Sequence, residues 1–272
     1  EFRRAHKTAR AVIIICRNRF CLCAGLAPQE VYSLNSCFTD MEIEELAEGM
    51  IRQYLGNLEN APLKVDIEGF LTRYLKLPLK FRSFAEEDSG KIGFISDGIT
   101  PLRVFAGRRP IREVFPKGTV VLEKGLQRRG EEGRRRFTLA HEAGHYIMDR
   151  TVTRACFHRE YDKGRAYSPR ELKELLNIQE TRVDRLAAAL LMPRFMVREV
   201  LGRFGVSWLI PIYGDNLLRL GDKLLVQKMA RAMGVSYTAF LIWLKELSLM
   251  ERHDISEYIT GEIGLGDGVM AL

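Results

Sequence analysis

The segment His141-Glu-Ala-Gly-His145 constrains the fold more than any other stretch of this sequence. Its two histidines are four residues apart, and side chains at this spacing point the same way on an α-helix. Apolar or small residues occupy the side that we expect to be buried, namely Phe137, Ala140, Gly144 and Ile147. The spacing therefore predicts a helix from about residue 136 to residue 148 with one side in the core.

Two imidazoles on one helix face can bind the same metal ion. Glu142 lies beside the two histidines but off their face, where its carboxylate can take a proton from a metal-activated water. We therefore interpret His141 and His145 as metal ligands and Glu142 as a general base. The alternative is a helix with two surface histidines that bind no ion.

A third ligand is available in Glu180-Thr-Arg-Val-Asp184, 35 residues after His145. The Ser168-Pro169 start signal predicts a helix here that runs through Leu191, with a possible break at Asn177. Glu180 can complete a His, His, Glu set for one catalytic Zn²⁺ and leave the fourth position for water. Asp184, one turn later, can accept a hydrogen bond from a ligand histidine and fix its tautomer.

Other readings of these acids stay open from spacing alone. Glu180 and Asp184 could form an exposed helix edge paired with Arg182 or Arg185. Three other acids could reach the metal in place of Glu180, namely Asp149, Glu171 and Glu174. A third histidine six residues after His145 is absent, because position 151 is Thr, and this argues against a metzincin arrangement.

The chain before this helix predicts a mixed α+β fold. Helical spacing and an acidic first turn predict a helix from about residue 40 to residue 55, capped by Thr39 or Asp40, and Asp66 can cap a second short helix. Glycines and prolines separate four segments of strand character, at 77–84, 92–96, 102–106 and 119–122. We expect these segments to form a small twisted, mainly antiparallel sheet.

The last segment, 196–272, predicts a C-terminal helical subdomain. Gly234 can end one helix and Ser236 can cap the next, which gives the pair a helix-turn-helix look. The second helix is strongly apolar, with Phe240 and Trp243 among its residues, whereas base reading needs polar side chains. We therefore expect this helix to pack against protein and do not expect direct DNA binding.

Residues 1–38 differ from the rest of the chain. They carry six Lys or Arg and two Glu, a net charge of +4 out of +7, and four of the five cysteines. We expect a poorly ordered basic extension, or upstream sequence ahead of a natural start near Met41. The remaining body has only Cys156 and no disulfide framework, which favours the cytoplasm. No apolar run reaches the roughly 20 residues of a membrane span, so we expect no membrane partner.

Two stretches resemble the ImmA/IrrE family of bacterial and phage zinc metallopeptidases. They are Arg135-Arg-Phe-Thr-Leu-Ala-His-Glu-Ala-Gly-His-Tyr146 and Glu180-Thr-Arg-Val-Asp-Arg-Leu-Ala-Ala-Ala-Leu-Leu-Met-Pro193. The resemblance implies a zincin-like catalytic domain over 39–195, with His141, His145 and Glu180 as zinc ligands and Glu142 as general base. The long spacing between His145 and Glu180 suggests an enlarged loop at 151–167.

The resemblance also implies a role. Studied family members cleave or otherwise inactivate a helix-turn-helix repressor, so we expect a protein substrate of this kind. Alternatives are a non-proteolytic anti-repressor and a DNA-binding regulator that retains a zinc site. A peptidase also needs a donor to the oxyanion, and four side chains are candidates, namely Tyr146, His158, Tyr161 and Tyr167.

Overall fold

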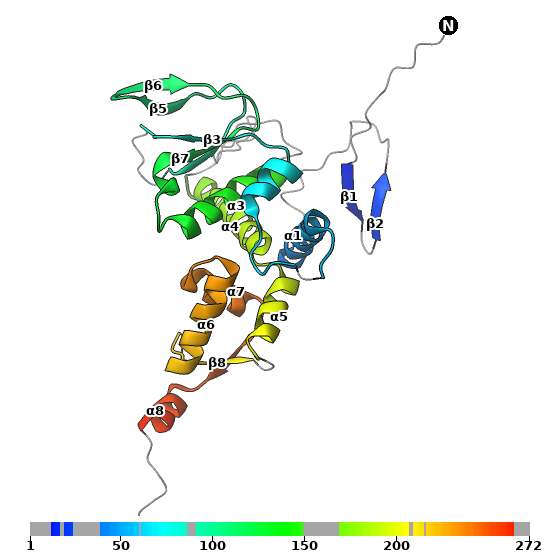
Figure 1. The fold of residues 1–272 in the computed structure, drawn as a ribbon, viewed down its shortest axis with the longest axis vertical. Coiled ribbons are helices and arrows are strands. Elements are labelled where there is room, and N and C mark those ends of the chain that lie inside the picture. The colour runs from blue at the N-terminus through cyan, green and yellow to red at the C-terminus, as the bar shows by residue number, and fades with distance from the viewer. Residues whose placement is uncertain are drawn as a thin grey trace, which may run out of the picture.

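The fold of the protein is given by a computed structural model (Figure 1). It describes residues 12–16, 19–23, 39–59, 61–85, 91–148, 169–206, 209–214 and 216–263. For 12–16, 19–23, 169–179 and 260–263 it describes the backbone alone. Helices and small sheets are mixed along the chain, so the α+β expectation holds.

The first helix, α1 (Asp40–Leu55), begins where the sequence predicts. Thr39 is its N-cap, and its side chain and that of Glu42 each accept a hydrogen bond from the other's backbone N–H. This reciprocal pair satisfies two amide groups that have no partner within the helix. The buried side includes Ile43, Ala47 and Ile51, which recur at helical spacing.

Asp66 caps the next helical segment, as predicted, by accepting a 2.9 Å hydrogen bond from the N–H of Gly69. The segment consists of α2 (Ile67–Gly69) and a π-helical turn, η2 (Phe70–Tyr74). Phe70 and Leu71 are fully buried in the main core. This segment packs against the helix that carries the two histidines.

The central sheet has three strands in the order β3 (Leu79–Arg82), β7 (Val120–Glu123) and β4 (Gly93–Ile95). β3 pairs with β7 in parallel, and β4 pairs with β7 antiparallel. The sheet is therefore mixed, which corrects the expectation of a mainly antiparallel one. The sequence of a strand shows its faces but not its neighbours, so the parallel pairing of β3 could not be predicted.

A separate hairpin, β5 (Leu102–Ala106) and β6 (Arg109–Glu113), turns at Gly107, where φ is +65°. The sequence predicted β5 but not β6. Pro110 is one of the prolines that indicate a break between strands, and four of the five residues of β6 are exposed, so no alternation of apolar and polar residues marks it. Proline is tolerated here because a strand edge needs no N–H donor on its open side.

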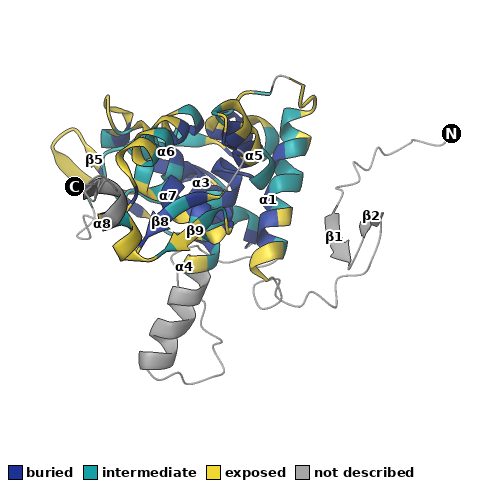
Figure 2. Cartoon of the chain, turned by 90° about the horizontal axis from the view of Figure 1, so that it is seen from below, coloured by how far each residue is buried: buried dark blue, intermediate teal, exposed yellow. Residues whose placement is uncertain are grey.

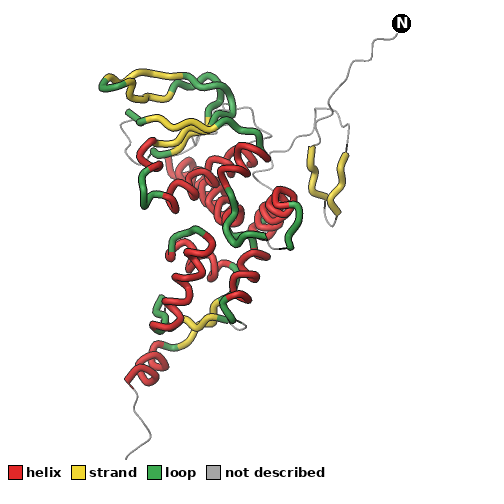
Figure 3. Tube along the Cα trace, viewed as in Figure 1, coloured by secondary structure: helices red, strands yellow, loops and turns green. Residues whose placement is uncertain are grey.

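Successive residues of β7 face opposite layers. Val120 and Leu122 belong to the main core, whereas Val121 packs with Leu102 and Val104 of the hairpin in a smaller core. The central sheet therefore lies between the hairpin and the helices, as Figure 3 shows for its strands and the helical layer. Both faces of β7 are buried, which explains its apolar run from Val120 to Leu122.

Helix α3 (Glu132–Met148) carries the two histidines and starts four residues before its predicted start. It packs against β4 and β7 on one side and against α4 (Pro169–Leu191) on another. Its buried surface is wider than predicted: Leu139 and Ala143 are fully buried, whereas Phe137 and Ile147 are only half-buried. A helix covered on two sides has no single buried stripe.

Helix α4 begins at Pro169, as predicted, and continues without interruption to Leu191, so the possible break at Asn177 was wrong. Gly144 of α3 allows α4 to approach closely, because a Cβ there would lie 3.0 Å from Cγ1 and 3.3 Å from the carbonyl oxygen of Val183. The loop expected at 151–167 lies outside the described residues.

The C-terminal part is helical but also contains strands that were not predicted. In chain order it contains α5 (Arg194–Arg203), β8 (Ile210–Tyr213), α6 (Leu220–Met233), α7 (Tyr237–Glu246), β9 (Met250–His253) and α8 (Ile255–Ile263). The strands β8 and β9 pair in parallel.

The turn between α6 and α7 follows the sequence signals. Gly234 ends α6 in the left-handed conformation, and the Ser236 side chain accepts a hydrogen bond from the N–H of Ala239 to cap α7. Phe240 and Trp243 are buried, which supports the packing role expected for this helix. Figure 2 shows the buried residues gathered between the helices, and one core continues from α1 to α7. The division of the chain near residue 195 stays a prediction.

The N-terminal stretch contains an antiparallel pair, β1 (Val12–Cys16) and β2 (Arg19–Cys23), that the sequence did not predict. The other residues of 1–38 lie outside the described residues. Within the part of the chain that the structure describes, no helix has the length and apolar character to cross a membrane.

We expect Trp243→Phe to lower the free energy of unfolding by about 2 kcal/mol. The indole Nε1–H donates a buried 2.7 Å hydrogen bond to the carbonyl of Met192, and phenylalanine leaves this acceptor unpaired. Urea unfolding followed by circular dichroism measures the loss. Ile242→Ala, at an exposed neighbour, should change the value by less than about 0.5 kcal/mol, and equal effects of the two variants would contradict the prediction.

Candidate metal centre

The two histidines of α3 meet as the helical spacing predicts. Nε2 of His141 lies 3.0 Å from Nε2 of His145, and the two rings are nearly perpendicular, with centroids 4.6 Å apart. His145 is buried and His141 is half-buried. The two lone-pair positions therefore face the same small volume beside the helix.

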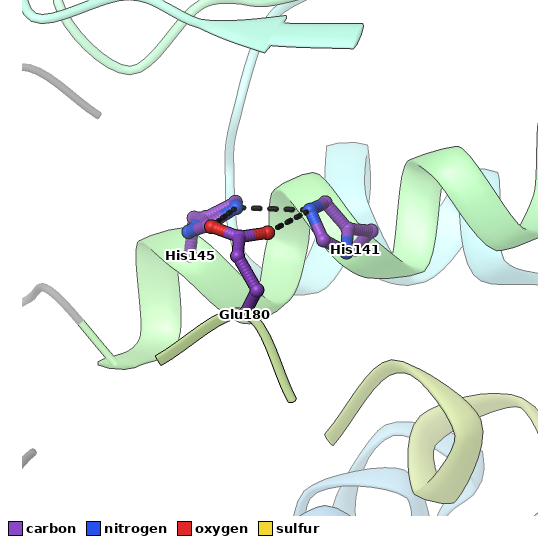
Figure 4. Close-up of side chains that lie close together, drawn as sticks. All are labelled: His141, His145 and Glu180. Atoms are coloured by element: carbon purple, nitrogen blue, oxygen red, sulfur yellow. Dashed lines mark hydrogen bonds and ion pairs between the residues drawn. The ribbon is translucent and has the colours of Figure 1, made fainter. Parts of the chain in front are cut away.

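Glu180 of α4 closes this volume from the other side (Figure 4). Its Oε2 lies 3.4 Å from Nε2 of His141, and its Oε1 lies 3.9 Å from Nε2 of His145. The tertiary packing of α3 on α4 thus brings together three side chains from segments 35 residues apart in the sequence.

These distances fit a small metal ion. Ligand atoms at about 2.1 Å from a tetrahedral zinc ion are about 3.4 Å apart, which is close to the measured separations. One atom from each of His141, His145 and Glu180 lies within 4.8 Å of the others, and no other described group of three such side chains does so. The side chains of Asp149, Glu171 and Glu174 lie outside the described residues, so their part as alternative ligands stays open.

Asp184 lies behind the first histidine. Its Oδ1 is 2.9 Å from Nδ1 of His141, on the side of the ring opposite to Nε2. This contact suits an Nδ1–H tautomer, which leaves the Nε2 lone pair for a metal ion and makes it more basic. Glu180 and Asp184 therefore act on the same imidazole from adjacent turns of α4.

The acids around His141 raise the pKa of its imidazole. Burial alone would lower the pKa of this imidazole, but hydrogen bonds to Asp184 and Glu180, with the charge of Glu142 nearby, raise it to about 10. In the metal-free protein these acids therefore hold a proton on His141 at neutral pH. The same acids would favour a metal cation in place of that proton.

Glu142 is buried and lies under strand β4. A Cβ added at Gly93 would be 2.4 Å from Oε1 of Glu142, so a larger residue at this point of the strand would displace the carboxylate. The carboxylate is thus held between α3 and the first residue of β4. Its assignment as a general base stays a prediction.

The candidates for the oxyanion donor fall in two groups. Tyr146 is half-buried and packs against the main core. His158, Tyr161 and Tyr167 lie outside the described residues. The role of all four stays a prediction.

Two features of the site could not be found from the sequence. Gly93 lay within a predicted strand, but nothing indicated that it faces Glu142. Arg185 was considered as a partner of Glu180 or Asp184, whereas its guanidinium pairs with Glu44 of α1 and Glu246 of α7. Both features depend on which elements pack together.

We expect zinc binding at about pH 8 to release the proton of His141. The metal-free pKa of about 10 leaves this imidazole protonated at that pH, and a metal ion needs its lone pair, so zinc affinity should rise with pH up to about 10. Asp184→Asn removes the negative charge beside Nδ1, lowers this pKa and reduces the number of protons released. Calorimetry in buffers of different protonation enthalpy measures this number.

The matched control is Glu257→Gln. Glu257 pairs with His253 at 3.0 Å, a similar acid–imidazole contact outside the metal centre. This variant should release as many protons as the unaltered protein. Equal release by all three proteins would show that Asp184 does not hold the proton on His141.

The comparison with protein families agrees with this geometry. Residues 125–244 match the M78 peptidase family model, described as the IrrE N-terminal-like domain. The matched region contains both histidines, Glu142 and Glu180, and it ends within α7. No curated protein matches the chain. Residues 125–244, which contain the candidate His-His-Glu zinc site, are thus similar to a domain of the ImmA/IrrE family of metallopeptidases.

Proposed function

We propose that the protein is a zinc-dependent endopeptidase that cleaves a regulatory protein, such as a helix-turn-helix repressor. The observation that carries this proposal is the convergence of His141, His145 and Glu180 beside the buried carboxylate of Glu142. A protein that only binds a partner needs no buried acid next to a metal site. The repressor as substrate is supported by resemblance to the family.

The chemistry divides between the ion and the side chains. When bound, zinc would act as a Lewis acid that lowers the pKa of water, so that hydroxide is available near neutral pH. Glu142 accepts the proton of the attacking water and then passes it to the leaving amine nitrogen. Asp184 holds the His141 ring in the orientation that presents Nε2.

The burial of Glu142 suits this task. A carboxylate with little contact with solvent keeps the proton that it takes until the leaving group needs it. Gly93 leaves room for the carboxylate under β4 while the strand restricts its movement. The base is therefore held in place on α3, one residue after His141.

Two alternative functions are displacement of a repressor without cleavage and direct binding to operator DNA. The burial of Phe240 and Trp243 leaves α7 with few polar groups for base edges, which speaks against operator binding by this helix. Glu142 speaks against simple displacement, because displacement requires no proton transfer.

We expect Glu142→Gln to reduce cleavage at least about 100-fold while zinc binding is kept. The zinc-loaded protein is incubated with the repressor encoded beside its gene, with and without a chelator, and fragments are identified by mass spectrometry. Glu199→Gln, which alters an exposed carboxylate of α5, is the matched control and should cleave normally.

The other outcomes separate the alternatives. Release of the repressor from its operator without fragments would support the anti-repressor and refute the peptidase. Tight operator binding by this chain alone would support the DNA-binding regulator. Cleavage that persists in Glu142→Gln would remove this residue from the mechanism.

A further inference from the structure

Arg185 directly follows Asp184 on α4 but points to a different side of the helix. Successive helical residues are about 100° apart, so Arg185 turns away from α3 while Glu180 and Asp184 turn toward it. Its side chain is only 16% exposed, against 53% for Asp184. The helix thus presents its acids to the metal centre and its arginine to the interior.

The guanidinium of Arg185 joins α4 to two other helices. Nη2 donates a 2.7 Å hydrogen bond to Glu44 of α1, and Nη1 donates a 2.8 Å bond to Glu246 of α7. Asp40 of α1 lies 3.3 Å from Nη1. The guanidinium also lies 5.8 Å from the ring centroid of Trp243 on α7. A planar group with donors in a fixed fork restricts the rotation of the helix that carries it.

Glu44 is itself fixed by a second arginine. Its side chain is 9% exposed, and its Oε2 accepts a 2.9 Å hydrogen bond from Arg194 of α5. The carboxylate therefore cannot follow Arg185 without breaking this second contact. The anchor of α4 is a network that includes α1, α5 and α7.

Stability alone is a poor explanation for this network. Buried ion pairs add little net stability compared with apolar packing, because both charges lose water. Nε of Arg185 is buried and has no hydrogen-bond partner among the described residues, which adds a further cost. Apolar residues in place of the whole network, Glu44 included, would cost less but would not fix the helix rotation.

Small rotations of α4 are large on the scale of a metal site. A side-chain atom about 6 Å from the helix axis moves about 2 Å when the helix turns by about 20°. This movement is as long as a zinc–oxygen bond. The separation of 3.4 Å between Glu180 and His141 therefore requires a helix that is fixed against rotation.

We propose that Arg185 is a positioning residue for the metal centre, which sets the rotation of α4 through Glu44 and Glu246 so that Glu180 and Asp184 meet His141. The proposal rests on the proposed zinc site. It also links α7, far along the chain, to the metal ligands. Arg185 does not touch the metal and acts only through the helix.

The experiment compares Arg185→Met with Arg194→Met in the full chain. Each variant removes one of the two guanidiniums that bind Glu44, but only Arg185 belongs to α4. Zinc affinity is measured by competition with a chelator, and Co²⁺ is used as a spectroscopic probe of ligand geometry. Urea unfolding of the metal-free proteins measures the stability of each variant.

We expect Arg185→Met to weaken zinc binding at least tenfold and to change the visible absorption of bound Co²⁺. Arg194→Met should bind zinc within about twofold of the unaltered protein and keep its Co²⁺ spectrum. Both variants should unfold at lower urea concentrations, because each leaves a buried carboxylate with fewer donors. Glu246→Gln, which weakens the α7 contact alone, should reduce zinc affinity by a smaller factor.

Equal losses of zinc affinity in the two methionine variants, or an unchanged Co²⁺ spectrum in Arg185→Met, would refute the positioning role. If Arg185→Met does not fold, Arg185→Lys replaces it under the same criteria, because lysine keeps the charge but lacks the fork. Failure of the unaltered protein to bind zinc or Co²⁺ would instead refute the metal site on which the proposed function depends.

Discussion

The contact between Gly144 of α3 and Val183 of α4 is the constraint on which the site depends. Gly144 lies between the two ligand histidines, and Val183 lies between Glu180 and Asp184. Where these two residues touch, the acids of one helix necessarily flank the imidazoles of the other. A larger residue at 144 would separate the helices by a few tenths of an ångström or more, a distance that matters for ligands that bind at about 2 Å.

The other side of α3 is held by the sheet. β4 and β7 pack on this helix. Gly93, the first residue of β4, has no side chain and can therefore lie directly over Glu142. The helix therefore presents the candidate metal site toward α4 and Glu142 toward β4. A glycine on each side permits this packing. Gly144 lets α4 approach α3, and Gly93 lets the backbone of β4 approach Glu142.

The electrostatics of the centre follow from the same packing. Glu142, Glu180 and Asp184 surround His141 in a partly dry environment, and their combined charge raises the pKa of this imidazole to about 10. Such an arrangement stabilises a positive charge, which is a proton on the imidazole or a metal ion beside it. On a different side of α4, Arg185 binds Glu44 of α1, which Arg194 of α5 also binds.

Short-range patterns determined much of this protein. The i,i+4 spacing of His141 and His145, the cap at Thr39 and the turn at Gly234 depend on neighbours in the chain, so the sequence alone predicts them. The acid pair Glu180 and Asp184 was also visible as a helical pair, although its partner was not fixed by spacing. Only tertiary packing decided that these acids meet His141 rather than another group. It also decided that β3 runs parallel to β7 and that Gly93 covers Glu142. The contacts of Arg185 with α1 and α7 depend on the same packing. The physical reason is that local structure depends on backbone geometry within a few residues, whereas these contacts join segments that meet only when apolar surfaces are buried together.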